Sequence, residues 1–229
     1  MKVRRLFAYR IQDMDTVVYV DGFNLYYRAL QGTRHKWLNL QALCEAALPN
    51  VCNVVAINYY TARVSSLRNP DSPKDQNTYL EALKTLPNLH IHLGNFQVMN
   101  KWMFLVQPVE FRPPSATPYP IPDFVRVVKT EEKGSDVNLG SHLVRDALTG
   151  VFTHAAIITN DTDLEEPLRI VVQEAKLAVT LLTPVSNPAG ALKRLATDVR
   201  HVEPYLGVSQ FPDPVNGRGG KPITKPADW

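Results

Sequence analysis

Short apolar runs alternate with helical patterns along most of this chain, and this alternation constrains the fold more than any other feature. The strand-like segments 17–20, 53–64 and 89–96 are separated by segments 37–49 and 76–87, whose apolar residues have helical spacing. Alternation of this kind predicts a parallel sheet with right-handed crossover connections.

The alternation breaks between Gly94 and Lys133. Segments 97–106 and 124–132 have the composition of strands, and the prolines that lie between them exclude a helix. We therefore predict a β-hairpin arm, residues 94–133, inserted into the sheet fold.

The alternation resumes after the arm. A helix at 136–150 is followed by segments that predict, in order, strand, helix, strand, short helix and edge strand: 155–161, 163–175, 178–184, 189–196 and 198–204. The tail from Phe211 is rich in Pro and Gly, which predicts a lack of regular structure.

One domain is the expectation for a chain of 229 residues, of which 45% are hydrophobic. We predict an N-terminal extension at 1–16, an α/β domain at 17–206 with sheet order 3-2-1-4-5, and an extended tail at 207–229. The net charge of +3 is too small to identify a nucleic-acid-binding protein. No segment has the length of apolar sequence that a signal peptide or a membrane span requires, so we expect a cytoplasmic protein without membrane contact.

Acidic residues lie where the predicted strands end. Asp21 ends the first strand, Asp161 and Asp163 follow the strand after the arm, and Asp136 begins the helix that leads into that strand. Ligands of open parallel sheets bind at the carboxyl ends of strands near the switch point. Carboxylates gathered there would repel one another by roughly 4 kcal/mol per close pair, which a hard cation such as Mg²⁺ would offset.

Each acid also fits a structural role. Asp21 suits a turn, Asn24 suits a helix N-cap, and Asp163 with Glu166 has the spacing of a capping-box variant. Asp136 suits the N-terminus of a helix.

Three segments resemble the motifs of NYN domains, which are relatives of the PIN-domain ribonucleases. They are "VVYVDGFNLYY", "KGSDVNLGSHLVRDAL" and "AAIITNDTDLEEPLRIVVQEA", and the resemblance runs from about Val17 to Pro204. Thr159 and Asn160 depart from the family pattern, since many relatives have Ser-Gly there.

The resemblance implies a PIN-like three-layer α/β/α fold and an endoribonuclease that depends on Mg²⁺ or Mn²⁺. Asp21, Asp136, Asp161 and Asp163 would then be metal ligands and catalytic residues, and Asn24 would orient a carboxylate, a water or the substrate. The expected partner is single-stranded RNA.

Basic residues are candidates for phosphate contacts. Arg63, Arg68 and Lys74 lie near the carboxyl edge, and Lys133 ends the arm. The arm itself carries basic and aromatic residues that suit either RNA or ordinary packing and subunit contacts: Lys101, Trp102, Phe104, Arg112, Arg126 and Lys129.

Other interpretations stay open at this point. A non-catalytic RNA-binding or assembly protein, or a metal-dependent enzyme with a small substrate, also fits the same fold. His90 and His92 share a strand face, but they lack a third ligand at a diagnostic spacing. A homo-oligomer would use the arm or the tail, and Trp229 is predicted to pack on the body or on a neighbouring subunit.

Overall fold

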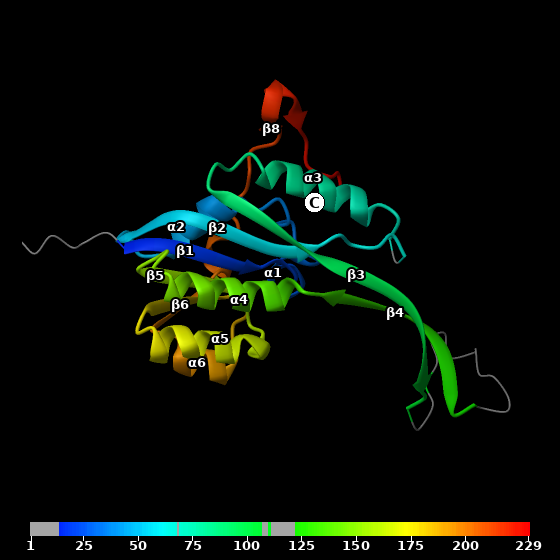
Figure 1. The fold of residues 1–229 in the computed structure, drawn as a ribbon. Coiled ribbons are helices and arrows are strands. Elements are labelled where there is room, and N and C mark those ends of the chain that lie inside the picture. Colours follow the sequence, from blue (N-terminus) through cyan, green and yellow to red (C-terminus); the bar gives the residue numbers. More distant parts are fainter. Residues whose placement is uncertain (1–13, 68, 107–109, 111–121) are drawn as a thin grey trace, which may run out of the picture.

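The computed structural model describes residues 14–67, 69–106, 110 and 122–229. Within these residues a seven-stranded sheet forms the centre of the molecule (Figure 1). Its strands are β1 (Met14–Asp21), β2 (Cys52–Ala62), β3 (Leu89–Phe104), β4 (Phe124–Lys133), β5 (His154–Ile158), β6 (Ala178–Thr183) and β7 (Asp198–His201).

The strand order is β4-β3-β2-β1-β5-β6-β7, and every neighbouring pair except β3–β4 is parallel. This order differs from the predicted 3-2-1-4-5. The reason is that β3 continues without a break from the sheet into the arm, so the arm strand β4 becomes an edge of the same sheet. The chain is therefore an α/β protein with a mostly parallel sheet.

Gly94 allows β3 to continue into the arm. A Cβ atom at this position would lie 2.9 Å from the carbonyl oxygen of Lys133 and 3.1 Å from the backbone nitrogen of Ser135. The first distance is shorter than real Cβ contacts and the second is tighter than most of them, so a side chain here would push the end of β4 away from β3.

Helices cover both faces of the sheet. The longer helices are α2 (Leu40–Ala47), α3 (Ser72–Leu83) and α4 (Ser135–Leu148), and the shorter ones are α1 (Gly22–Leu25), α5 (Glu165–Arg169) and α6 (Gly190–Leu195). Helices α1 and α5 each continue into a wider π-helical turn, η1 (Tyr26–Leu30) and η3 (Ile170–Glu174), and the 3₁₀ turn η2 (Thr162–Leu164) precedes α5.

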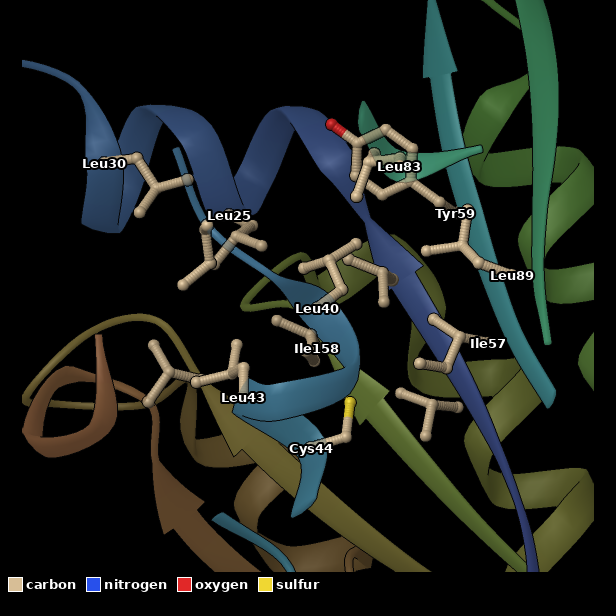
Figure 2. Close-up of a cluster of buried hydrophobic side chains, with 14 of the residues drawn as sticks. Leu25, Leu30, Leu40, Leu43, Cys44, Ile57, Tyr59, Leu83, Leu89 and Ile158 are labelled. Carbon is tan, nitrogen blue, oxygen red and sulfur yellow. The ribbon is translucent and has the colours of Figure 1, made fainter. Parts of the chain in front are cut away.

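Alternate residues of the central strands enter two separate cores. Val18 and Val20 pack with α1, α2 and α3 on one face, whereas Val17 and Tyr19 pack with α4, α5 and α6 on the other. Figure 2 shows part of the first core, where Leu40 and Leu43 of α2 meet Ile158 of the sheet. Each fully buried leucine stabilises the fold by about 1.5–3 kcal/mol, so both layers of helices are held to the sheet.

Helix boundaries differ from the sequence prediction at three points. Asp21, and not Asn24, is the N-cap residue of α1. The side chain of Asp161 caps η2, so Asp163 and Glu166 do not form a capping box; Glu166 instead pairs with Arg169. Helix α3 begins at Ser72, ahead of the helical segment 76–87 that the sequence predicts, and ends at Leu83.

The C-terminal tail is ordered against the body. It contains a small antiparallel pair, β8 (Val215–Asn216) and β9 (Pro222–Ile223), so the expected lack of regular structure is wrong. The ring of Trp229 lies 6.3 Å from that of Trp37 and 5.8 Å from that of Tyr79, which confirms that the last residue packs on the domain.

Candidate functional site

Asp21 stands at the carboxyl end of β1, between β2 and β5. The side chain is 4% exposed. Its Oδ1 accepts a hydrogen bond from the backbone N–H of Asn24 (3.0 Å), and its Oδ2 accepts one from the hydroxyl of Thr159 (3.0 Å). The carboxylate is therefore fixed in orientation by both neighbouring segments.

Gly22 makes the turn after Asp21 possible. A Cβ atom on Gly22 would lie 2.7 Å from the carbonyl oxygen of Tyr60 and 2.7 Å from the ring of Tyr59. Because α1 begins this close to β2, its first residue must lack a side chain.

The segment after β5 forms the second half of the site. The hydroxyl of Thr159 accepts a hydrogen bond from the backbone N–H of Asp161 (3.0 Å), so this one group connects Asp21 to the turn that carries Asp161. Asn24 Oδ1 accepts a hydrogen bond from the N–H of Asn160 (3.0 Å), and Asn160 Oδ1 accepts one from the N–H of Ala189 (2.7 Å). These hydrogen bonds join β1, β5 and the start of α6 at one edge of the sheet.

Asp21 has an unusual protonation equilibrium. Burial raises its pKa from 3.8 to about 6, the charges of Asp136 and Asp161 add to the increase, and the hydrogen bonds from Asn24 and Thr159 oppose it. The pKa of Asp136 is also raised, first by burial and then by the charges of Asp161 and Glu132. A carboxyl group that titrates near neutral pH can accept and release a proton during a reaction.

The four predicted acids thus gather at the same edge, but they do not form a metal centre. In the part of the chain that the structure describes, no three His, Cys, Asp or Glu side chains are close enough together to hold a metal ion. Asp21 is turned toward Thr159 and the α1 turn, and Asp161 accepts the N–H of Asp163 (3.0 Å). Asp21, Asp136, Asp161 and Asp163 therefore share one edge of the sheet, and their roles as site residues stay predictions.

An open cleft of about 590 Å³ is lined by two of the four acids, Asp136 and Asp163. It lies between α4 and the η2–α5 segment, and Asp136, Asp163 and Glu166 are on its walls. Lys133 is also there, but its ammonium pairs with Glu131 at 3.0 Å. The cleft is large enough for a small organic molecule.

The other predicted contact residues are dispersed. Arg63 donates to the side chain of Asn77 (2.9 Å) and Lys74 lies in the first turns of α3. Arg68 lies outside the described residues, as does Arg112 of the arm. These residues and Lys133 stay predictions as substrate contacts.

The histidine pair of β3 does not form a site of its own. His92 Nε2 lies 3.0 Å from Asn58 Oδ1, and its ring stacks on Tyr60 with centroids 4.7 Å apart. His142 of α4 completes this cluster, with its ring 4.9 Å from His92. The helix position of His142 is too distant in sequence for spacing to reveal the contact.

Thr159 and Asn160 are the functional-site residues that sequence reasoning missed. The sequence analysis noted them as a departure from a family pattern, whereas the structure shows that their side chains hold Asp21 and the start of α6 in place. The sequence could have revealed these two residues by their position directly after a buried strand, since the side chains of threonine and asparagine often form hydrogen bonds with nearby backbone groups.

The buried Asp21 at the carboxyl end of β1 and the open cleft lined by Asp136 and Asp163 mark this edge of an α/β sheet as the candidate functional site. The chain is 31% identical to the 6-hydroxy-3-succinoylpyridine 3-monooxygenase HspA of Pseudomonas putida, in an alignment that covers 95% of this chain and 76% of the relative. The chain therefore belongs to the family of this monooxygenase.

Other comparisons concern the fold. No family model matches the chain. The crystal structure of a protein of unknown function from Vibrio parahaemolyticus is similar, with a TM-score of 0.52 and 16% identity over 88% of this chain and 96% of that one. A similarity at this level of identity shows a shared fold alone. The resemblance to NYN domains, the domain boundaries and the RNA partner all stay predictions.

Family membership overturns the predicted activity. The relative is named as a monooxygenase, which is an oxidoreductase and not a phosphodiester hydrolase, so the ribonuclease prediction is wrong. The predicted Mg²⁺ or Mn²⁺ is wrong as well, because oxygen insertion depends on redox groups such as flavin. Motifs that place acids at strand ends mark a site but do not fix its chemistry.

One expectation concerned membranes. Among the described residues, no helix is both long and apolar enough to cross a bilayer.

Proposed function

We propose that this protein is an oxidoreductase that oxygenates a small, hydroxylated nitrogen heteroaromatic compound. Its relationship to a named hydroxypyridine monooxygenase over 95% of the chain supports the class of reaction. The observation that carries the proposal for this site is the buried Asp21 carboxyl, with a pKa of about 6, whose charge neighbour Asp136 lines a cleft of about 590 Å³.

The chemistry suggested by the relative's name requires a base. In 6-hydroxy-3-succinoylpyridine, position 3 is para to the hydroxyl group, so loss of the hydroxyl proton raises electron density at the carbon that receives oxygen. This carbon already carries the succinoyl group, so formation of the new C–O bond is accompanied by cleavage of the bond between the ring and the acyl group, which leaves and is taken up by water as the carboxylic acid. Asp21 is ionised above about pH 6 and fits the role of this base. Asp136 lines the cleft, and we assign it to orienting the ring, whereas Asn24, whose Oδ1 accepts the N–H of Asn160, is assigned to holding the turn beside Asp21.

Asp161 and Asp163 have a different role, because they act on the other acids and not on the substrate. Their charges raise the pKa values of the other acids, since Asp161 acts on Asp21 and both act on Asp136. They also carry the turn that Thr159 anchors. We therefore assign them to tuning and positioning.

A redox group supplies the activation of O₂ in such reactions. The turn between β1 and α1 does not fit the pyrophosphate of a flavin or nicotinamide dinucleotide. A pyrophosphate binds the free N–H groups of a helix start, and here the Asp21 carboxylate already accepts the N–H of Asn24, in a helix of four residues. We therefore assign no dinucleotide to this turn. The PIN-like architecture remains part of the proposal as a statement about fold alone.

The test is oxygen incorporation. The purified full chain is incubated with 6-hydroxy-3-succinoylpyridine, a nicotinamide reductant, added FAD or FMN and ¹⁸O₂, and the products are analysed by mass spectrometry. We expect one ¹⁸O atom in the ring product and loss of this signal in Asp21→Asn. The matched control is Asp71→Asn, because Asp71 is an exposed acid whose side chain caps nothing. Absence of ¹⁸O with this and related hydroxypyridines would overturn the proposal.

A further inference from the structure

The arm formed by β4 and the distal part of β3 extends away from the body of the molecule (Figure 1). Its two strands pair in antiparallel register from Asn95 opposite Lys133 to Phe104 opposite Phe124. A two-stranded ribbon is marginally stable by itself, because it lacks a layer that buries its side chains.

One face of the ribbon is rich in exposed apolar side chains. Directly paired residues of antiparallel strands share a face, so Trp102 and Arg126 lie on the same side as Phe104 and Phe124. The exposed fractions are 65% for Trp102, 74% for Phe104 and 45% for Phe124. We call this surface the aromatic face; its members are Val98, Asn100, Trp102, Phe104, Phe124, Arg126, Val128 and Thr130.

The opposite face has a different composition. It carries the charged side chains of Lys101, Lys129 and Glu131, and the last two form an ion pair with each other. On the aromatic face between Val98 and Thr130, Arg126 is the single charged residue among those described. Interface cores are enriched in aromatic residues and Arg and depleted in Lys and Glu, and the aromatic face has this composition.

We propose that the aromatic face binds the same face of a second copy of this chain, which gives a twofold symmetric dimer. The apolar side chains of one face expose on the order of 500 Å², so two faces in contact would bury about 1,000 Å². This is about the lower limit of area for a specific protein interface, so the expected dimer is one of moderate affinity. A second copy of the same chain is always present. When the two aromatic faces pack together, each two-stranded ribbon buries the exposed side chains of the other, which stabilises both. The inference does not depend on the proposed function.

Two other occupants of this face fit less well. The chain's own C-terminal tail is occupied elsewhere, since Trp229 packs on Trp37 and Tyr79. A nucleic acid strand needs several cations along its phosphates, and the aromatic face offers Arg126 alone among its described residues.

The test is the mass of the full-length protein in solution, measured by sedimentation velocity over a range of micromolar concentrations. We expect a species of twice the 25.7 kDa chain mass. The double variant Trp102→Glu/Phe104→Glu is expected to weaken dimerisation by at least about tenfold, because it places charges in the buried centre. Circular dichroism melting checks that each variant is folded.

The matched control is Met103→Glu. Met103 is the chain neighbour of both residues, is 42% exposed and lies on the opposite face, so this variant is expected to remain dimeric. A wild-type protein that stays monomeric over this range would overturn the inference. So would equal dissociation by Met103→Glu, or a monomer whose aromatic face instead binds added single-stranded RNA or lipid vesicles.

Discussion

The hydroxyl of Thr159 donates a hydrogen bond to Oδ2 of Asp21 across 3.0 Å, although the two residues are 138 positions apart in the chain. Thr159 is fully buried, and the same hydroxyl accepts the N–H of Asp161. One side chain therefore sets both the orientation of the proposed base and the conformation of the acidic turn beside it.

Replacement of Thr159 by Val removes this donor while keeping the shape of the side chain. The hydrogen bond favours the ionised form of Asp21, so its loss is expected to raise the pKa of Asp21 further above about 6 and to move the acidic limb of the pH–activity profile upward. Stability is expected to fall by about 1–3 kcal/mol, since a buried acceptor loses its partner. Thr159→Ser retains the hydroxyl and serves as the control. An unshifted profile in an active Thr159→Val variant would show that Thr159 has a structural role alone.

The Asp21 carboxyl also links stability to pH. Its pKa is raised on folding from 3.8 to about 6, so the folded state is disfavoured by ionisation of this group. The contribution of Asp21 to stability is fully present below pH 3.8 and is lost as the pH rises through about 6. The free energy of unfolding is therefore lower by roughly 3 kcal/mol above pH 6 than below pH 3.8 on account of this group.

Asp21→Asn is therefore expected to stabilise the protein by up to about 3 kcal/mol near pH 8, and to have little effect near pH 4. Urea denaturation at both pH values measures the difference, with Asp71→Asn as the exposed control. A variant that is destabilised at pH 8 would mean that the charged hydrogen bonds of Asp21 outweigh its burial.

Much of the fold was accessible from the sequence because local rules act on each segment separately. The patterns of 17–20 and 53–64 predict buried strands; the first segment lies within β1, and the second overlaps β2, which ends at Ala62. The predicted strand order also places the first strand beside the strand that follows the arm, as the structure does with β1 and β5. This neighbourhood brings Asp21, Asp136 and Asp161 to one edge of the sheet.

The remainder depends on contacts between distant segments. The continuity of β3 through Gly94 requires the close passage of Lys133 and Ser135, which no local pattern records. Whether the acids can share a metal ion depends on the orientation of their side chains. Nearby hydrogen-bond donors set this orientation, as the N–H group of Asn24 does for Asp21 and that of Asp163 does for Asp161. The class of reaction is harder still to predict from the sequence pattern, because the same edge of the same kind of sheet supports many different reactions in different proteins.

Gly22 offers a test of the close approach of α1 to β2. Gly22→Ala is expected to destabilise the protein by about 1–3 kcal/mol and to displace Asp21, because the new Cβ would lie 2.7 Å from the backbone oxygen of Tyr60. Gly190→Ala is the matched control, since it also begins a helix but meets the mobile end of Arg194 at 3.4 Å. Equal melting temperatures for the two variants would contradict the steric argument.

The C-terminal tail has two parts, and removal of each is expected to lower the stability of the protein by a different amount. Phe211 and Val215 are buried in the core on the α2–α3 side of the sheet, and the indole N–H of Trp37 donates to the carbonyl of Pro212 (3.1 Å). Trp229, by contrast, is half-buried and packs on the outside of the same core.

Deletion of residues 211–229 is therefore expected to cost more than about 4 kcal/mol, because it removes Phe211 from the core and leaves the Trp37 indole without its acceptor. The sequence predicts only an extended tail without regular structure, which does not anticipate the burial of Phe211 in the core. Trp229→Ala is expected to cost about 1–2 kcal/mol, because part of the indole is already exposed and the end of the chain gains freedom when released. Thermal melting of both variants separates the two parts of the tail: comparable losses would mean that Trp229 anchors the segment, and that Phe211 does not hold it independently.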